Sequence, residues 1–215
     1  MKYLVDAQNI GHSFDSNLFN NVNLKIMERE SIAILGVSGS GKSTLINNLS
    51  TLLAPKNGIV SLCGINDIYK QEQNILLELR RDKVGIIFQS HYLFRGFSAL
   101  ENLQVTSILS NRDIDMELLR FFNIDTILNQ QIGELSGGQQ QRLSIARVLT
   151  KKPKIIFADE PTGNLDKTNT YNVMGAIFNY IDKYNAALII ATHDIEVANM
   201  CDRKYMLKNE ILSFM

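Results

Sequence analysis

A glycine-rich loop early in the chain has the residue types that bind phosphate. Residues 36–43 read GVSGSGKS and fit the pattern GxxxxGK[ST], between an apolar run and a helical pattern. Glycines let backbone N–H groups wrap around phosphate oxygens, and the dipole of the helix N-terminus favours an anion. Lys42 should therefore reach the β- and γ-phosphates of ATP, and the Ser43 hydroxyl should ligate Mg²⁺. The nucleotide contacts expected in this loop are Gly36, Val37, Ser38, Gly39, Ser40, Gly41, Lys42, Ser43 and Thr44.

Two acidic residues follow another apolar run. Residues 155–158 are continuously apolar and lead into Asp159 and Glu160. A carboxylate at the end of a buried strand needs a cation, so Asp159 should hold Mg²⁺ through the ion's water shell. Glu160 is placed to polarise an attacking water, and general-base groups contribute about 10²–10⁴ in rate. A strand running into an acidic turn would explain these acids alone, but their combination with the phosphate-binding loop favours catalysis.

Four apolar runs should position these groups. They are residues 31–35, 84–88, 155–158 and 187–191. Continuous rather than alternating apolar residues are typical of strands that are buried on both faces of a parallel sheet. In open α/β sheets, ligands bind at the carboxyl ends of the strands. We therefore expect the glycine loop, Gln89, the two acids and His193 to converge at one edge of one sheet.

The other segments predict helices and a second sheet around this core. Apolar residues at helical spacing predict helices at residues 42–53, 138–150 and 167–184. Alternating patterns predict an antiparallel sheet and a terminal hairpin, with strands at residues 3–10 and 22–26 and the hairpin at 203–214. In the last helix, plain core packing is expected of Tyr171, Met174, Ile177, Phe178 and Ile181.

The segment after Gln89 differs in character from the rest. It lacks a strong strand pattern and includes a helix-like run at residues 116–122. We predict one domain over residues 1–215, with an α/β core at 1–89 and 145–215. A helical subdomain is expected at about 90–144.

The pentapeptide Leu135-Ser136-Gly137-Gly138-Gln139 resembles the signature motif of ATP-binding cassette (ABC) ATPases. Ser136 is a natural helix N-cap, and the two glycines leave backbone donors accessible. An incidental Ser-Gly-Gly turn before a helix is the alternative interpretation. In ABC ATPases this motif contacts the γ-phosphate of ATP held by the partner subunit. The resemblance therefore implies a RecA-like P-loop core and a homodimer joined by two ATP molecules.

Other positions match the family's motifs in order. The resemblance implies that Gln89 is the Q-loop glutamine, which binds Mg²⁺ or the lytic water. This glutamine also senses a membrane subunit. Residues 163–166, which include Asp166, resemble the D-loop that links the two nucleotide sites. His193 resembles the switch histidine that contacts the γ-phosphate and orients the water. Phe14 stands where the family has an aromatic that stacks on adenine, although an aromatic there is otherwise often core. His12 and His91 receive no such role.

Within the family, residues 158–166 are similar to the subgroup of lipoprotein-releasing, macrolide-exporter and FtsE-like cell-division ATPases. Residues 89–103 look closest to the lipoprotein-releasing type. Their apolar members either dock a membrane subunit or fill the core of the helical subdomain: Leu93, Phe94 and Phe97. The chain departs from the family pattern at two places. The connection after Glu101 is short, and Arg29 replaces the glycine that is usual in the turn before the phosphate-loop strand.

Composition narrows the classes of function. With 22 basic and 22 acidic residues and a formal charge of +0, the chain lacks the basic excess of a nucleic-acid binder. Neither Cys63 nor Cys201 has a CxxC or metal-ligand spacing. The N-terminal residues lack a signal-peptide run, and no stretch approaches the roughly 20 apolar residues of a membrane span. We expect a cytoplasmic protein, held at the cytoplasmic face of the inner membrane only through an integral membrane permease subunit.

Three classes of function follow from the resemblance. The first is an ATPase for lipoprotein release or tripartite export. The second is a module that couples ATP to a cell-division membrane protein without transport. DNA-repair and translation-factor cassettes are disfavoured, because there is no long coiled-coil insertion, second cassette or basic excess.

Overall fold

The computed structural model describes residues 3–163 and 165–215, so Met1, Lys2 and the D-loop residue Asn164 lie outside the described residues. Its strands are β1 (Val5–Ser13), β2 (Asn17–Ile26), β3 (Ser31–Leu35), β4 (Asn57–Leu62), β5 (Val84–Ile87), β6 (Ile155–Asp159), β7 (Ala187–Thr192), β8 (Arg203–Lys208) and β9 (Ile211–Phe214). Its α-helices are α1 (Lys42–Leu49), α2 (Gln73–Glu78), α3 (Ala99–Ser110), α4 (Met116–Phe121), α5 (Gly137–Thr150), α6 (Lys167–Tyr184) and α7 (Ile195–Asn199). Short 3₁₀ turns occur at Ile68–Lys70 and Ile132–Glu134, and a π-helical turn at Leu79–Lys83.

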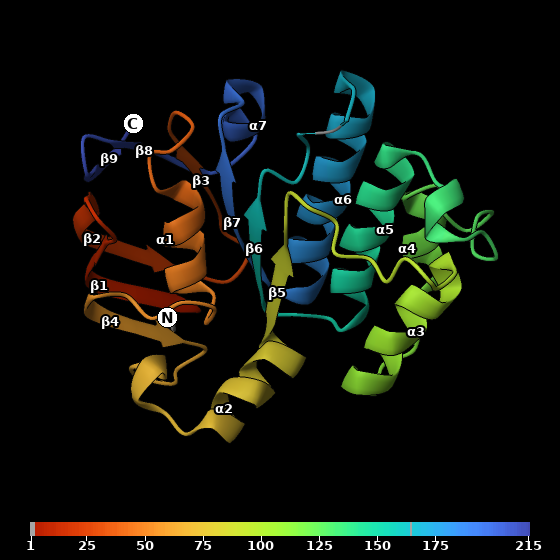
Figure 1. The fold of residues 1–215 in the computed structure, drawn as a ribbon, viewed down its shortest axis with the longest axis horizontal. Helices are drawn as coiled ribbons and strands as arrows, with labels where there is room; N and C mark the ends of the chain where they lie inside the picture. The colour runs from red at the N-terminus through yellow and green to blue at the C-terminus, as the bar shows by residue number, and fades with distance from the viewer. Residues whose placement is uncertain (1–2, 164) are drawn as a thin grey trace.

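A six-stranded sheet in the order β5-β6-β7-β3-β8-β9 forms the centre (Figure 1). All neighbouring strands run parallel except β8 and β9, which form the predicted hairpin. The register places Leu35 opposite Thr192 and Asp159 opposite Ala191. The carboxyl ends of the four predicted core strands therefore lie at one edge, which confirms the predicted α/β core.

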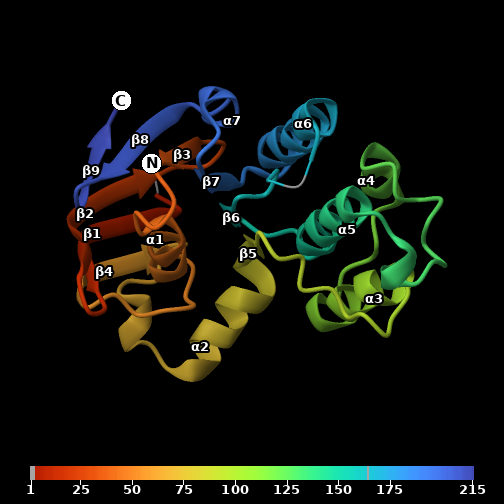
Figure 2. The ribbon, with the colours of Figure 1, turned by 45° about the horizontal axis from the view of Figure 1, so that its top comes forward.

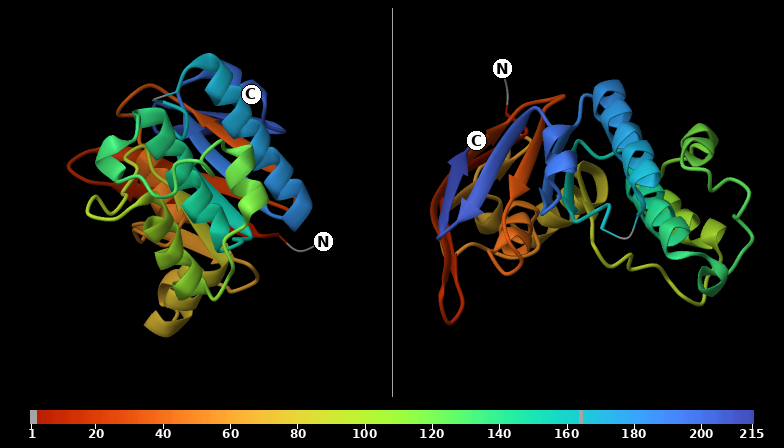
Figure 3. Two further views of the ribbon diagram at one scale, coloured as in Figure 1. Left: turned by 90° about the vertical axis from the view of Figure 1, so that its right-hand side faces the viewer. Right: turned by 90° about the horizontal axis from the view of Figure 1, so that it is seen from above.

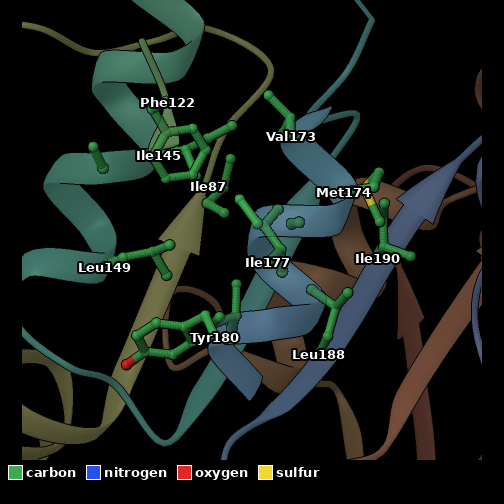
Figure 4. Close-up of a cluster of buried hydrophobic side chains, with 14 of the residues drawn as sticks. Ile87, Phe122, Ile145, Leu149, Val173, Met174, Ile177, Tyr180, Leu188 and Ile190 are labelled. Carbon is green, nitrogen blue, oxygen red and sulfur yellow. The ribbon is translucent and has the colours of Figure 1, made fainter. Parts of the chain in front are cut away.

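A separate antiparallel sheet, β2-β1-β4, covers one face of the central sheet, with α1 between them (Figures 1 and 2). Leu45, Ile46 and Leu49 of α1 belong to the same buried cluster as Ile10 of β1 and Ile32 of β3. Alternate residues of the central strands point to the other face, where α5 and α6 pack. Figure 4 shows this second cluster, which includes Ile87, Ile145, Leu149, Val173, Met174, Ile177, Leu188 and Ile190.

Helices α3, α4 and α5 form the side of the molecule farthest from the antiparallel sheet (Figure 3). Ser98 caps α3 and Ser136 caps α5, and the side chains of Glu101 and Gln139 in turn accept from the backbone N–H groups of these serines. Helix α5 runs without interruption through residue 144, where the sequence analysis places the end of the helical subdomain. No helix in the described part of the chain is long and apolar enough to cross a membrane.

Several predicted elements differ in detail from the structure. The helix predicted at 42–53 ends at Leu49, and neither β4 nor α2 was expected. The prediction that Tyr171 packs in the core is wrong, because the residue is 45% exposed. Its hydroxyl lies 3.4 Å from Glu196 of α7 instead. The buried residues of α6 begin at Val173, so Tyr171 precedes the stretch of the helix that packs on the core.

The partly buried Lys151 makes the stability of the fold depend on pH. Its Nζ donates to the Arg80 carbonyl at 2.6 Å, and burial lowers the pKa of Lys151 from 10.5 to about 8, against the opposing charge of Asp82. Between about pH 8 and 10.5 the unfolded chain holds more protons, so stability rises with pH. In urea denaturation, we expect the free energy of unfolding to rise relative to Lys151→Met by up to about 3 kcal/mol across this interval. If the free energies of unfolding of the wild type and of Lys151→Met changed with pH in the same way, this prediction would be contradicted.

Candidate nucleotide-binding site

An open cavity of about 670 Å³ lies at the carboxyl edge of the central sheet. It brings together residues from the start of β2, the loop after β3, and the ends of β5, β6 and β7. Its walls are Phe14, Leu18, Val37, Ser38, Gly39, Gly41, Lys42, Ser43, Thr44, Gln89, Asp159, Glu160 and His193. Gly36 lies at the buried base of the loop, and Ser40 lines an adjoining hollow. The predicted convergence of the four strand ends is therefore present in the structure.

The loop after β3 depends on its glycines for shape. Gly41 has φ 98°, in the left-handed region, and stands immediately before the first residue of α1. A Cβ at Gly36 would lie 2.8 Å from the Leu207 carbonyl oxygen, so a side chain would push the loop off β8. Lys42 is 7% exposed, and its Nζ donates to the carbonyls of Gly36 at 2.8 Å and Val37 at 3.1 Å. An ammonium group is thus held inside the loop, where phosphate oxygens would be its competing acceptors.

Asp159 has the features of a cation ligand. Its Oδ1 is buried and has no hydrogen-bond partner among the described residues. Burial raises the pKa of Asp159, and the negative charge of Glu160 adds to this, whereas Ser43 and Lys42 oppose it. Carboxylate, hydroxyl and amide oxygens are the ligands that Mg²⁺ prefers, and Asp159, Ser43 and Gln89 line the same cavity. These residues therefore fit the ion.

Glu160 is held by residues at the carboxyl end of β7 and directly after it. Its Oε1 lies 2.8 Å from His193 Nδ1, and its Oε2 accepts from the Thr192 hydroxyl at 3.2 Å. Its backbone N–H donates to the Ala191 carbonyl at 2.9 Å, and its φ of 48° is uncommon for a residue with a side chain. The carboxylate thus enters the cavity from a constrained backbone with both oxygens in contact with polar groups. This is an arrangement suited to orienting a water molecule.

Phe14 stands at the rim of the cavity rather than in the core. Its side chain is 64% exposed, and its ring makes an edge contact with the buried His12 ring, with centroids 4.9 Å apart. The His12 ring is in turn anchored by Asn48, whose Nδ2 lies 3.3 Å from Nδ1. The core alternative for Phe14 is therefore excluded, and an open aromatic face remains for a planar base.

The signature residues do not line this cavity. Ser136 and Gly137 are exposed at the N-terminus of α5, where the Ser136 hydroxyl accepts from the Gln139 N–H at 3.2 Å. Asp166 is also exposed and caps α6, and the N–H of Asn169 holds the pKa of its carboxyl below the usual range. The structure thus separates five predicted nucleotide contacts from the rest: Ser136, Gly137, Gly138, Gln139 and Asp166.

Two residues of the site escaped the sequence analysis. Leu18 lines the cavity from β2, and its place depends on how the antiparallel sheet packs on the loop after β3. Thr192 ends β7 directly before His193, and its hydroxyl contacts the Glu160 carboxylate. Both contacts join segments far apart in the sequence. A search for a polar residue buried at the end of a core strand would have found Thr192.

A family model described as ABC transporter matches residues 19–163. A protein from Rickettsia bellii named lipoprotein-releasing system ATP-binding protein LolD is 40% identical over 202 residues, which cover 91% of this chain and 89% of the relative. A protein of the same name from Treponema denticola is 36% identical and covers 88% of this chain and 86% of the relative.

A solved structure with a similar fold is that of MJ0796, described as a bacterial ABC transporter cassette in dimeric form. It has a TM-score of 0.88 and 33% identity, and the match covers 97% of this chain and 96% of that one. A second dimeric structure of MJ0796, in a post-hydrolysis state bound to ADP and Pi, matches with the same TM-score and identity.

Proposed function

Because this chain belongs to the ABC transporter family as an ATP-binding subunit with ATPase activity, we propose that two copies power a separate membrane subunit, most like lipoprotein release from the inner membrane. The observation that carries the proposal is the division of the site. One cavity holds the phosphate loop, the cation ligands and the water-orienting acid, whereas the signature residues stand on α5 outside it.

A homodimer reunites the two halves. One nucleotide cannot occupy both anion sites of a single chain, but the α5 N-terminus of one copy can meet the γ-phosphate held by the other. Ser136 and Gly137 are exposed, and a Cβ at Gly137 would meet no atom within 4 Å, so the backbone donors of this helix start are accessible. The dimeric structures of MJ0796 support this arrangement.

Within each site, positioning and electrostatics carry most of the catalysis. Lys42 binds the β- and γ-phosphates, while Glu160 accepts a proton from the attacking water and His193 keeps that water in line. Phe14 stacks on adenine. Mg²⁺, held by Ser43, Gln89 and Asp159, supplies positive charge beside the phosphate oxygens when bound. Asp166 lies in the D-loop that links the two sites.

The surface around Phe94 is the proposed contact for the membrane subunit. Phe94 and Phe97 are 48% and 41% exposed, and their rings are in tilted contact with centroids 5.4 Å apart. The Arg147 guanidinium lies 5.7 Å from the Phe94 centroid. Leu93, in contrast, is half-buried against the core. The partial burial of Leu93 supports the packing alternative for that residue, and the exposure of the phenylalanine pair supports docking.

The relatives named as lipoprotein-releasing ATP-binding proteins support the release function over export or cell-division roles. In this reading the chain lies at the cytoplasmic face of the inner membrane and touches the membrane only through its partner. The alternative is an ATPase of a tripartite exporter or of a cell-division complex that does not transport.

The test is to purify tagged Glu160→Gln protein from native membranes with ATP and to identify the bound proteins by mass spectrometry. We expect a few-span membrane subunit with a large periplasmic domain. Adding Phe94→Ser and Phe97→Ser should remove it, whereas Ile211→Ser, at an even more exposed apolar position on β9, should not. A four-span subunit with cell-wall hydrolases would instead indicate the cell-division role. Purification without any membrane protein would overturn the docking proposal.

A further inference from the structure

We propose that Thr192 is a positioning residue for Glu160, which fixes the water-activating carboxylate independently of His193. The inference rests on the proposed role of Glu160 as the group that activates water. It goes beyond that role by assigning a function to a residue that does not line the nucleotide cavity.

The hydrogen bonds around the Thr192 hydroxyl determine its direction. Its oxygen accepts from the backbone N–H of Asp194 at 3.0 Å, and the same oxygen lies 3.2 Å from Glu160 Oε2. A hydroxyl has one proton to give. Because a backbone N–H can only donate, the hydroxyl proton is left for the carboxylate. Thr192 therefore donates to Glu160, and this bond fixes the direction in which the carboxylate points.

Thr192 also differs from His193 in how firmly it is placed. Thr192 is 1% exposed at the end of β7, paired in register with Leu35 of β3. The His193 side chain is 70% exposed, so solvent or a nucleotide can displace its ring from Glu160. Of the two contacts on the carboxylate, the buried one persists when the exposed one is exchanged for phosphate. Thr192 thus keeps Oε2 in place while His193 changes partner.

The geometry predicts an effect on the chemical step and not on ATP binding. Thr192 lines a hollow behind the Glu160–His193 pair, together with Thr162 and Lys167, and it does not line the nucleotide cavity. Losing its hydroxyl would free the carboxylate to rotate without changing a contact with the phosphates or the base. Because the direction of the Glu160 carboxylate matters for the attack of water and not for ATP binding, its loss should lower kcat and leave KM unchanged.

The test compares Thr192→Val, which has the same shape without a hydroxyl, with Thr192→Ser, which keeps the hydroxyl. We expect Thr192→Val to lower kcat by about 10-fold or more with a KM for ATP within about 2-fold of wild type. Thr192→Ser should restore kcat to within about 2-fold of wild type. The matched control is Thr150→Val, because Thr150 is 2% exposed and its hydroxyl donates only to the Ala146 carbonyl at 2.9 Å. This control should leave kcat unchanged.

Two outcomes would overturn the inference: wild-type kcat in Thr192→Val, or a serine variant that is as slow as the valine variant while melting at the wild-type temperature. If Thr192→Val raises the KM by as large a factor as it lowers kcat, or if it lowers the melting temperature, the residue acts on the fold and the inference fails. Glu160→Gln, assayed in parallel, tests the proposed function separately. Its retention of wild-type hydrolysis would refute Glu160 as base, whatever Thr192 does.

Discussion

Glu160→Gln should bind ATP as the wild type does and hydrolyse it about 10²–10⁴ times more slowly, which is the usual contribution of a general base. Glutamine keeps the length of the side chain and can accept from Thr192, but its amide cannot take a proton from water. The expected loss is confined to kcat because Lys42 and the glycine loop are untouched. Steady-state ATPase assays and equilibrium binding of a fluorescent ATP analogue measure the two quantities.

The same variant should accumulate as an ATP-bound dimer in size-exclusion chromatography, since the nucleotide that joins the two copies in the proposed dimer is no longer consumed. ADP should leave it as a monomer. Glu196→Gln is the matched control, because this nearby exposed carboxylate pairs with Lys167 at 2.8 Å and lies outside the nucleotide cavity. It should hydrolyse ATP at the wild-type rate. If Glu160→Gln hydrolysed ATP at the wild-type rate, the assignment of Glu160 as the general base would be refuted.

The central sheet was predictable because its strands are buried on both faces. Residues 31–35 and 187–191 are continuous apolar runs, and the structure places them side by side as β3 and β7. The strand β4 was missed because it has one face toward solvent and a mixed sequence, NGIVSL. Its place is set by pairing with β1, with Val5 opposite Leu62, and such a contact is not encoded locally.

Arg29 shows how the chain tolerates a departure from the family pattern. The resemblance has glycine at this turn, and Arg29 indeed adopts φ 62°, a conformation that costs a residue with a Cβ about 1 kcal/mol or more. Its backbone N–H donates to the Ala186 carbonyl at 2.7 Å and its Nε to Asn185 Oδ1 at 2.6 Å. These contacts join the turn before β3 to the turn before β7. The sequence marks the departure, but the compensating contacts appear only in the fold.

The residues of the candidate site also divide into those that a local sequence pattern identifies and those whose contacts depend on the fold. Motif residues such as Lys42 and Asp159 were predictable, since each belongs to a local pattern whose chemistry is specific. The contact from Thr192 to Glu160 was not, because it depends on β6 and β7 being neighbours in register. Sequence patterns identify the groups that do chemistry, and the fold reveals which neighbours hold them.

Lys42→Ala should raise the Kd for ATP by at least about 100-fold, which corresponds to about 2.7 kcal/mol and abolishes binding at micromolar ATP. Charge-assisted bonds to phosphate are the strong ones, and Lys42 is 7% exposed, so water screens its charge weakly. Isothermal titration calorimetry with ATP measures the change. An unchanged Kd would refute the phosphate-loop assignment.

Lys42 also holds the loop together, so its removal must be separated from a general loss of structure. Its Nζ bonds to the carbonyls of Gly36 and Val37 could shape the loop even without nucleotide. Lys154 is the matched control, because its Nζ likewise donates to a backbone carbonyl, that of Tyr184 at 2.7 Å, beside the amino end of β6. Lys154→Ala should lose stability without losing ATP affinity. Lys42→Ala should lose ATP affinity, and its melting temperature should fall no further than that of Lys154→Ala, because both lysines hold backbone carbonyls but only Lys42 lines the nucleotide cavity.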